Sequence, residues 1–103
     1  MADGPGRHAI SREQAKAYLG AWQRGRAKGT VLGGYMDRRV LDALLAQPGC
    51  VGVRYYNARH PEGRDTIVLV GVNAADEDLW DGTIAEELDP CPPRCAPNSL
   101  TDE

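Results

Sequence analysis

Three cysteines and two histidines are the residues of this chain best suited to bind a metal ion. Cys91 and Cys95 are separated by three residues, two of which are prolines, and Cys50 lies far upstream. Zinc prefers about four sulfur or nitrogen ligands in a tetrahedron. Cys50, Cys91 and Cys95 with one histidine, His60 or else His8, form a candidate zinc site. The C-x3-C spacing and the absence of a second cysteine pair weaken this interpretation.

A disulfide between Cys91 and Cys95 is the alternative, and in a reducing cytosol it would act as a switch. It requires the two Cα atoms to lie within about 7 Å of each other. A cis peptide bond before Pro92 or Pro93 would allow that approach. In the simplest interpretation Cys50 is a small core residue and the proline-rich segment is a rigid clasp over the rest of the fold.

Basic and aromatic side chains near position 56 suggest an anion or partner site. Arginine can grip a carboxylate or a phosphate with two hydrogen bonds. The simpler expectation is that one arginine pairs with an acid of the loop 76–81 and that the tyrosine packs across its strand. The candidate residues are Arg54, Tyr56, Arg59 and Arg64.

Catalytic and calcium-binding patterns fail when they are tested against the sequence. His60 precedes a proline in a predicted exposed turn, without a nucleophile motif nearby. In the acidic loop 76–82, Trp80 and Asp81 occupy the positions where an EF-hand requires an oxygen ligand and a glycine. We therefore name no catalytic residue and no cofactor other than zinc, and favour a protein that is not an enzyme. A small enzyme or anion binder built around Arg54, Tyr56 and His60 is a third interpretation, which would require a pocket that joins them.

Two helices are predicted in the first half of the chain. Ser11 and Gln14 form a capping-box pattern before an apolar stripe that reaches Trp22, and Gly25 ends that helix. Asp37 is a good N-cap for the second helix, which Pro48 and Gly49 terminate. The expected buried positions of the second helix are Val40, Leu41, Leu44 and Leu45.

A β-hairpin is predicted from strands 50–57 and 66–73, joined by a turn over 58–65. The second strand is apolar on both faces, which is typical of a strand covered on both sides. A two-stranded hairpin is marginal alone. A third strand must therefore come from residues 30–32 or from another copy of the chain. Residues 83–88 are expected to form a short helical turn.

Composition narrows the class of protein. The 103 residues suit a single domain with a thin core. The net charge of −3 and the scattered basic residues argue against nucleic-acid binding. The longest apolar run has six residues, whereas a membrane helix needs about 20. Without a signal peptide, the expected location is the cytoplasm.

Three motifs in this order resemble a set of small bacterial proteins with no established activity. They are the run from Gln47 to Tyr56 (QPGCVGVRYY), the VGV run at 70–72, and the closing motif Cys91-Pro-Pro-Arg-Cys95. The resemblance covers roughly residues 37–98. It implies a bacterial, cytoplasmic protein and transfers no functional residue.

Together these features predict an α+β fold with two N-terminal helices packed on a small antiparallel hairpin-based sheet. The domain spans 11–90, between a tail at 1–10 and a Pro/Cys-rich segment at 91–103. The predicted function is a non-enzymatic module that self-associates through the hairpin; Gly52 and Gly71 would permit close backbone approach. The alternative is a zinc-binding or thiol-redox protein that uses Cys91 and Cys95.

Overall fold

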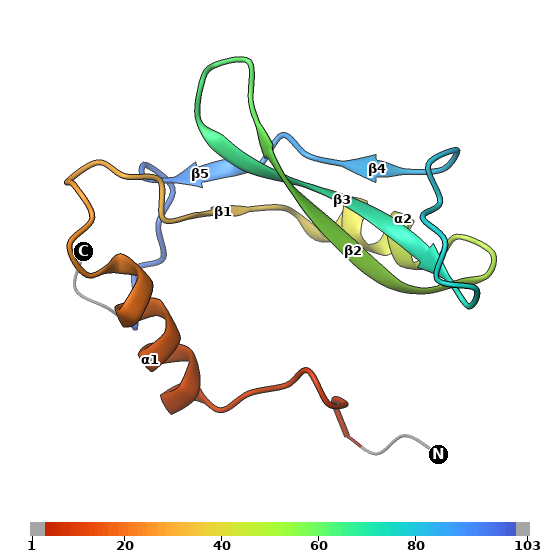
Figure 1. Cartoon of the computed structure of the whole chain (residues 1–103), viewed down its shortest axis with the longest axis horizontal. Coiled ribbons are helices and arrows are strands. Elements are labelled where there is room, and N and C mark those ends of the chain that lie inside the picture. The colour runs from red at the N-terminus through yellow and green to blue at the C-terminus, as the bar shows by residue number, and fades with distance from the viewer. Residues whose placement is uncertain (1–3, 101–103) are drawn as a thin grey trace. The chain divides into compact units, whose positions relative to one another are not determined.

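The computed structural model describes residues 4–100 and confirms the α+β class, with two helices and two antiparallel sheets (Figure 1). The chain divides into two compact units. One contains the residues up to 30 and those from 95 onward, and the other contains residues 31–94. The domain expected over 11–90 therefore corresponds to neither unit alone.

The first unit is built around helix α1, Arg12–Gln23. The predicted capping box is present, because Ser11 Oγ accepts a hydrogen bond from the Gln14 amide and the Gln14 side chain accepts one from the Ser11 amide. The helix ends before Gly25, whose φ of 81° suits only glycine well. None of the residues of α1 is buried. Two helices were expected to pack on the hairpin sheet, and within the second unit this packing is made by the second helix.

The second unit holds a three-stranded antiparallel sheet in the order β2-β3-β4. Strand β2 spans Cys50–Arg59, β3 spans Asp65–Asn73, and β4 is the short segment Ile84–Ala85. The predicted hairpin is present, with strands slightly longer than expected. The third strand is β4 of the same chain, which is neither of the two sources considered, residues 30–32 or another copy.

A two-stranded ribbon forms the other sheet of this unit. Strand β1 (Gly33–Tyr35) pairs antiparallel with β5 (Asp89–Cys91). The helical turn expected over 83–88 is absent from the described chain, because β4 and the approach to β5 occupy that segment. Strands β1 and β5 have three residues each, which is too few for periodicity to reveal them.

Helix α2, Arg38–Leu45, packs on β2, β3 and β4, and in Figure 1 it lies behind the long hairpin. Its predicted N-cap is confirmed, because Asp37 Oδ1 accepts a hydrogen bond from the Arg39 amide. Leu44 is fully buried, whereas Leu45 is 56% exposed and was wrongly expected in the core. Among the described residues the buried apolar core contains only Leu44, Val70, Val72 and Ala85.

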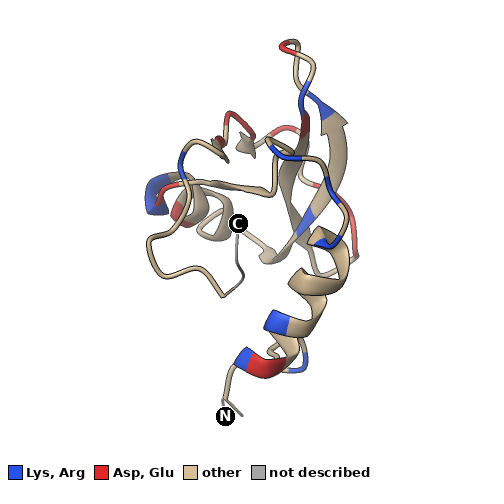
Figure 2. Ribbon diagram, turned by 90° about the vertical axis from the view of Figure 1, so that its left-hand side faces the viewer, with Lys and Arg blue, Asp and Glu red and all other residues tan. Residues whose placement is uncertain are grey.

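Basic and acidic residues lie close together at the tip of the hairpin in the second unit. Figure 2 shows blue and red segments together at the hairpin tip, where Arg59 pairs with Asp65 and Arg64 pairs with Glu62. Neither helix, within residues 4–100, has the length and apolar character needed to cross a lipid bilayer.

Candidate functional site

The outer edge of β2, which faces away from β3, has no strand partner in the second unit. Strand β2 has ten residues and pairs with β3 along one edge. Within residues 4–100, β3 and α2 are the only helix or strand neighbours of β2. Its second edge therefore presents backbone N–H and C=O groups without a strand partner.

Apolar side chains accompany this free edge. Val51 is 70% exposed, Val53 is 40% exposed and Tyr55 is 62% exposed. Natural edge strands are commonly protected by lysine, proline or a bulge. Here the register shift lies at Val51, near one end, and the pairing from Gly52 to Arg59 is continuous. Eight consecutive residues of a regular strand edge are thus open, without lysine or proline among them.

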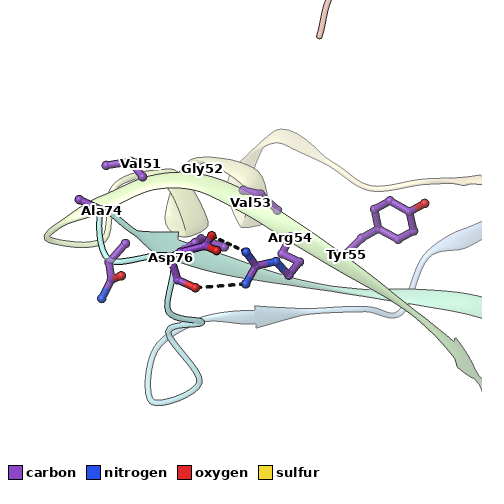
Figure 3. Close-up of a pocket in the computed structure, with 9 residues that line it drawn as sticks. Val51, Gly52, Val53, Arg54, Tyr55, Ala74 and Asp76 are labelled. Carbon is purple, nitrogen blue, oxygen red and sulfur yellow. Dashed lines mark hydrogen bonds and ion pairs between the residues drawn. The ribbon is translucent and has the colours of Figure 1, made fainter. Parts of the chain in front are cut away.

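A shallow groove of about 510 Å³ lies at the start of β2 (Figure 3). Its β2 wall is the segment 51–55, and its other wall is formed by the end of β3 and the loop that follows, up to Asp76. Apolar side chains and the ion pair of Arg54 share the lining. The groove is open to solvent and suits a protein side chain or backbone better than an enclosed small molecule.

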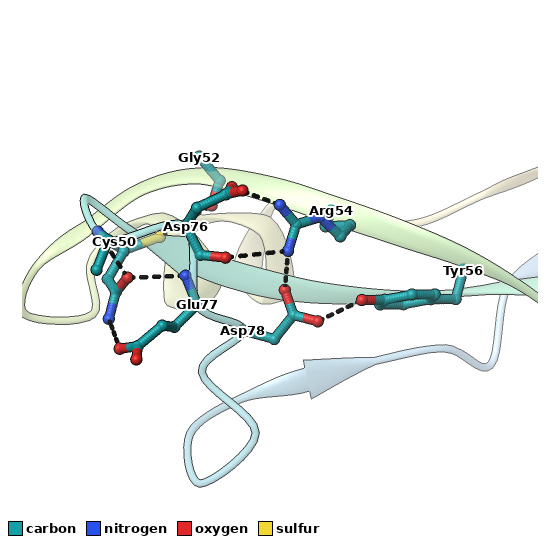
Figure 4. A network of polar contacts seen from close by, with 9 residues as sticks. Cys50, Gly52, Arg54, Tyr56, Asp76, Glu77 and Asp78 are labelled. Carbon is teal, nitrogen blue, oxygen red and sulfur yellow. Dashed lines mark hydrogen bonds and ion pairs between the residues drawn. The ribbon is translucent and has the colours of Figure 1, made fainter.

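A polar network fixes the loop 74–82 against the opposite face of β2 (Figure 4). Arg54 Nη2 lies 2.5 Å from Asp76 Oδ1, and Arg54 Nη1 donates to Asp78 Oδ1. The Tyr56 hydroxyl donates to the other oxygen of Asp78. These two carboxylates raise the pKa of Arg54, and the hydrogen bond to Asp78 raises the pKa of Tyr56.

The turn that carries these acids is organised by Asn73. Its side-chain oxygen accepts hydrogen bonds from the amides of Ala75 and Glu77, at 3.0 Å each. Trp80, from the same loop, lies against Tyr56 with 5.7 Å between the ring centroids. The loop is thereby held against the Arg54 and Tyr56 side chains of β2.

Each of the predicted anion-binding residues is engaged within the chain. Arg54 and Tyr56 contact the loop acids, Arg59 Nη2 lies 3.2 Å from Asp65 Oδ1, and Arg64 pairs with Glu62. For Arg54 this is the simpler expectation, an ion pair with an acid of the loop 76–81. An anion would have to displace these carboxylates, so the geometry favours a structural role for the four residues.

The structure does not bring the four predicted zinc ligands together. Cys91 and Cys95 are disulfide-bonded, and Cys50 is the free cysteine. The peptide bonds before Pro92 and Pro93 are both cis. Cys50 begins β2 and His60 follows its end, and a ten-residue strand separates them by about 30 Å. Zinc ligation by the two bonded cysteines would first require reduction. His8, the other histidine considered, lies in the first unit.

His60 has different neighbours from those expected. Its side chain is 11% exposed, although the turn was predicted to leave it in solvent. Glu87 Oε1 lies 3.4 Å from His60 Nε2, and Glu86 is close enough to complete a three-residue group. The sequence offered no signal for either glutamate, because neither falls in a motif.

Comparisons with known protein families, with curated proteins and with solved structures find no match to this chain. The expected resemblance to small bacterial proteins therefore stays a prediction.

Proposed function

We propose that this chain is a non-enzymatic, self-associating module whose β2 edge pairs antiparallel with β2 of a second copy. The observation that carries the proposal is the eight-residue regular edge from Gly52 to Arg59, which contains exposed Val53 and Tyr55 and is preceded by exposed Val51. Strand addition at such an edge is a common mode of protein recognition. Pairing through the hairpin would join two three-stranded sheets into one continuous sheet.

A second copy suits this edge because the strand is complementary to itself. Most homodimers have two-fold symmetry, so the same surface patch meets itself. In an antiparallel pair centred on Arg54, Val53 of each copy lies opposite Tyr55 of the other. Pairs of an aromatic and a β-branched residue are among the favourable cross-strand combinations, contributing roughly 0.2–1 kcal/mol each.

The positive charge of Arg54 does not oppose the register centred on this residue. The two Arg54 side chains would lie opposite each other at the symmetry axis, where like charges normally destabilise a sheet. Each guanidinium already pairs with Asp76 and Asp78 of its own chain, so the two arginines would not face each other as unpaired positive charges. The network of Figure 4 thus makes the centre of β2 compatible with a symmetric partner.

Native mass spectrometry of the purified chain tests the proposal. We expect a dimer for the wild type and a monomer for Tyr55→Lys, because a lysine would place an unpaired charge opposite Val53 of the other copy. Leu45→Lys is the matched control, since Leu45 is 56% exposed but lies on α2. It should remain dimeric.

The circular dichroism of all three proteins should be alike, because both substituted side chains are mainly solvent-exposed. A wild-type chain that stays monomeric up to high micromolar concentration would contradict self-association. A dimer that survives Tyr55→Lys but dissociates in Leu45→Lys would place the interface on the helix instead.

Thiol-redox activity is a second candidate, favoured by the observed bonding of Cys91 and Cys95. The predicted cytoplasmic location would keep such cysteines reduced. Disulfides that do form there are usually transient and either catalytic or redox-sensing. A dithiol reductant would transfer two electrons and two protons to the bond and become a disulfide itself. Arg94, between the cysteines, contacts Asp89 at 2.6 Å and lies 3.7 Å from the centre of the Tyr35 ring.

Cycling between the two states can be measured by thiol labelling after equilibration with thioredoxin-class dithiols. The redox interpretation expects one labelled thiol, that of Cys50, in the oxidised chain and three after reduction, reversibly and without loss of the fold. The variant with Ser at both 91 and 95 should show one in either condition. Loss of the fold on reduction would identify the disulfide as a structural bond.

A further inference from the structure

We infer that His60, Glu86 and Glu87 form a binding site for a divalent transition-metal ion such as Zn²⁺. One ligand atom from each residue lies within 4.8 Å of the other two. One imidazole and two carboxylates form a donor set used by zinc and its first-row neighbours. This site is independent of the cysteines and of the proposed pairing of β2.

Charge at this cluster is unbalanced in the direction that attracts a cation. Glu62 is paired with Arg64. Within residues 4–100, no lysine or arginine pairs with Glu86 or Glu87, whose nearest basic neighbour is the His60 ring. Two carboxylates without a permanent positive partner, beside a mainly buried imidazole, form a local concentration of negative charge.

Glu86 is held ready as a ligand by its surroundings. The Thr66 hydroxyl donates to Glu86 Oε2 at 3.0 Å, and Thr66 is itself buried. This hydrogen bond fixes the direction of the Glu86 carboxylate beside His60, as a supporting residue does for a metal ligand.

Glu87 completes the group through an unusual backbone conformation. Its φ of 53° lies in the left-handed region, which non-glycine residues rarely adopt. The Glu87 side chain is 81% exposed, so it is free to move. Tetrahedral zinc with bonds of about 2.0–2.1 Å places ligand atoms about 3.3 Å apart. The ligand atoms, which lie within 4.8 Å of one another, would therefore have to close by at most about 1.5 Å, a distance that side-chain rotations can cover.

The imidazole has a partner for the proton that metal binding would relocate. His60 Nδ1 accepts a hydrogen bond from the Glu62 amide at 3.0 Å, so the ring proton lies on Nε2, toward Glu87. A metal at Nε2 requires the proton at Nδ1 instead. Glu62 Oε1, which pairs with Arg64, lies 3.7 Å from Nδ1, beyond hydrogen-bond distance. A rotation of the Glu62 side chain would have to bring this oxygen to the Nδ1 proton, and the contact from the Glu62 amide would be lost.

Isothermal titration of the full chain with Zn²⁺ tests this site. We expect one bound ion in the wild type, with an affinity at least tenfold weaker in His60→Gln and in Glu87→Gln. Thr66→Val, which removes the support of Glu86, should weaken binding by about tenfold. Asp81→Asn, which removes one exposed negative charge from the same unit, should bind as the wild type does.

Cysteine ligation is distinguished by Co²⁺ and by Cys50→Ser. Co²⁺ in the proposed site should show no thiolate charge-transfer absorption, and Cys50→Ser should bind unchanged. The melting temperature should rise with Zn²⁺ concentration in the wild type and not in Glu87→Gln. Absence of bound Zn²⁺, full binding by His60→Gln, or loss of binding in Cys50→Ser would each overturn the inference. Each of these outcomes is independent of whether the chain dimerises.

Discussion

At the scale of single residues, Gly71 lies where β3 is packed most closely. A Cβ atom at this position would be 2.6 Å from Gln47 Nε2 and 3.1 Å from Cys50 Sγ. Gln47 cannot easily retreat, because it donates to Leu44 O at 2.8 Å and accepts from the Thr83 amide at 2.9 Å. The close neighbours of Gly71 are thus side chains of the same chain, whereas the backbone approach expected at Gly52 and Gly71 on self-association stays a prediction.

Gly71→Ala is therefore expected to lower the free energy of unfolding by about 1–3 kcal/mol, the usual cost of overpacking. Gly52→Ala is the control, because a Cβ there would meet no atom within 4 Å. Its effect should stay within about 0.5 kcal/mol. Urea unfolding of both variants measures this difference, and equal effects would show that packing at Gly71 is not limiting.

Tyr56 gives a pH-dependent prediction at the same scale. The hydrogen bond to Asp78 raises its pKa, so the neutral phenol is favoured in the folded chain. This contribution to stability is present below the unfolded pKa of about 10 and is lost as the pH rises through the higher folded value.

Ultraviolet titration of the phenols should therefore show one tyrosine that ionises late in the wild type. Asp78→Asn should shift that step to lower pH, because it removes the carboxylate that disfavours the phenolate. An unchanged titration in Asp78→Asn would mean that the hydrogen bond drawn in Figure 4 is not formed in solution.

At the scale of elements, helix α2 is the main cover of the sheet. Leu44 is fully buried while its neighbour Leu45 is 56% exposed. Leu44→Ala should lower the free energy of unfolding by about 2–5 kcal/mol. Leu45→Ala should change it by less than about 1 kcal/mol, and thermal melts compare the two. Similar losses would mean that Leu45 is covered in solution, which would direct attention to α2 as an interface.

The sequence was most informative where a local pattern determines the structure. The capping box at Ser11, the N-cap at Asp37 and the alternation along β2 each depend on residues close in sequence, and each was recovered. The strands β1, β4 and β5 were missed because they have two or three residues and pair over long sequence distances. No local period marks such segments.

The candidate sites were predictable to a smaller extent. The alternation of Val51, Val53 and Tyr55 was evident, but their exposure depends on which strand ends up at the edge. Cys50 and His60 were grouped by residue type, yet a whole strand separates them. Glu86 and Glu87 approach His60 only because the chain after β4 passes the hairpin turn.

At the scale of the whole molecule, the small core is the property that most needs explanation. Four apolar residues are buried among those described, while aromatic and β-branched side chains along β2 remain exposed. A chain of this size is marginally stable when its own core is thin. Pairing with a second copy would bury part of that apolar surface and satisfy the open strand edge.

Amide hydrogen exchange of β2, measured at two protein concentrations, tests this account most directly. Pairing with a second copy predicts that the β2 amides pointing away from β3 become more protected as concentration rises, while those bonded to β3 change little. Tyr55→Lys should abolish this dependence. Exchange of the outward amides that is fast and equal at both concentrations, in a chain that remains folded, would contradict the proposed pairing of β2.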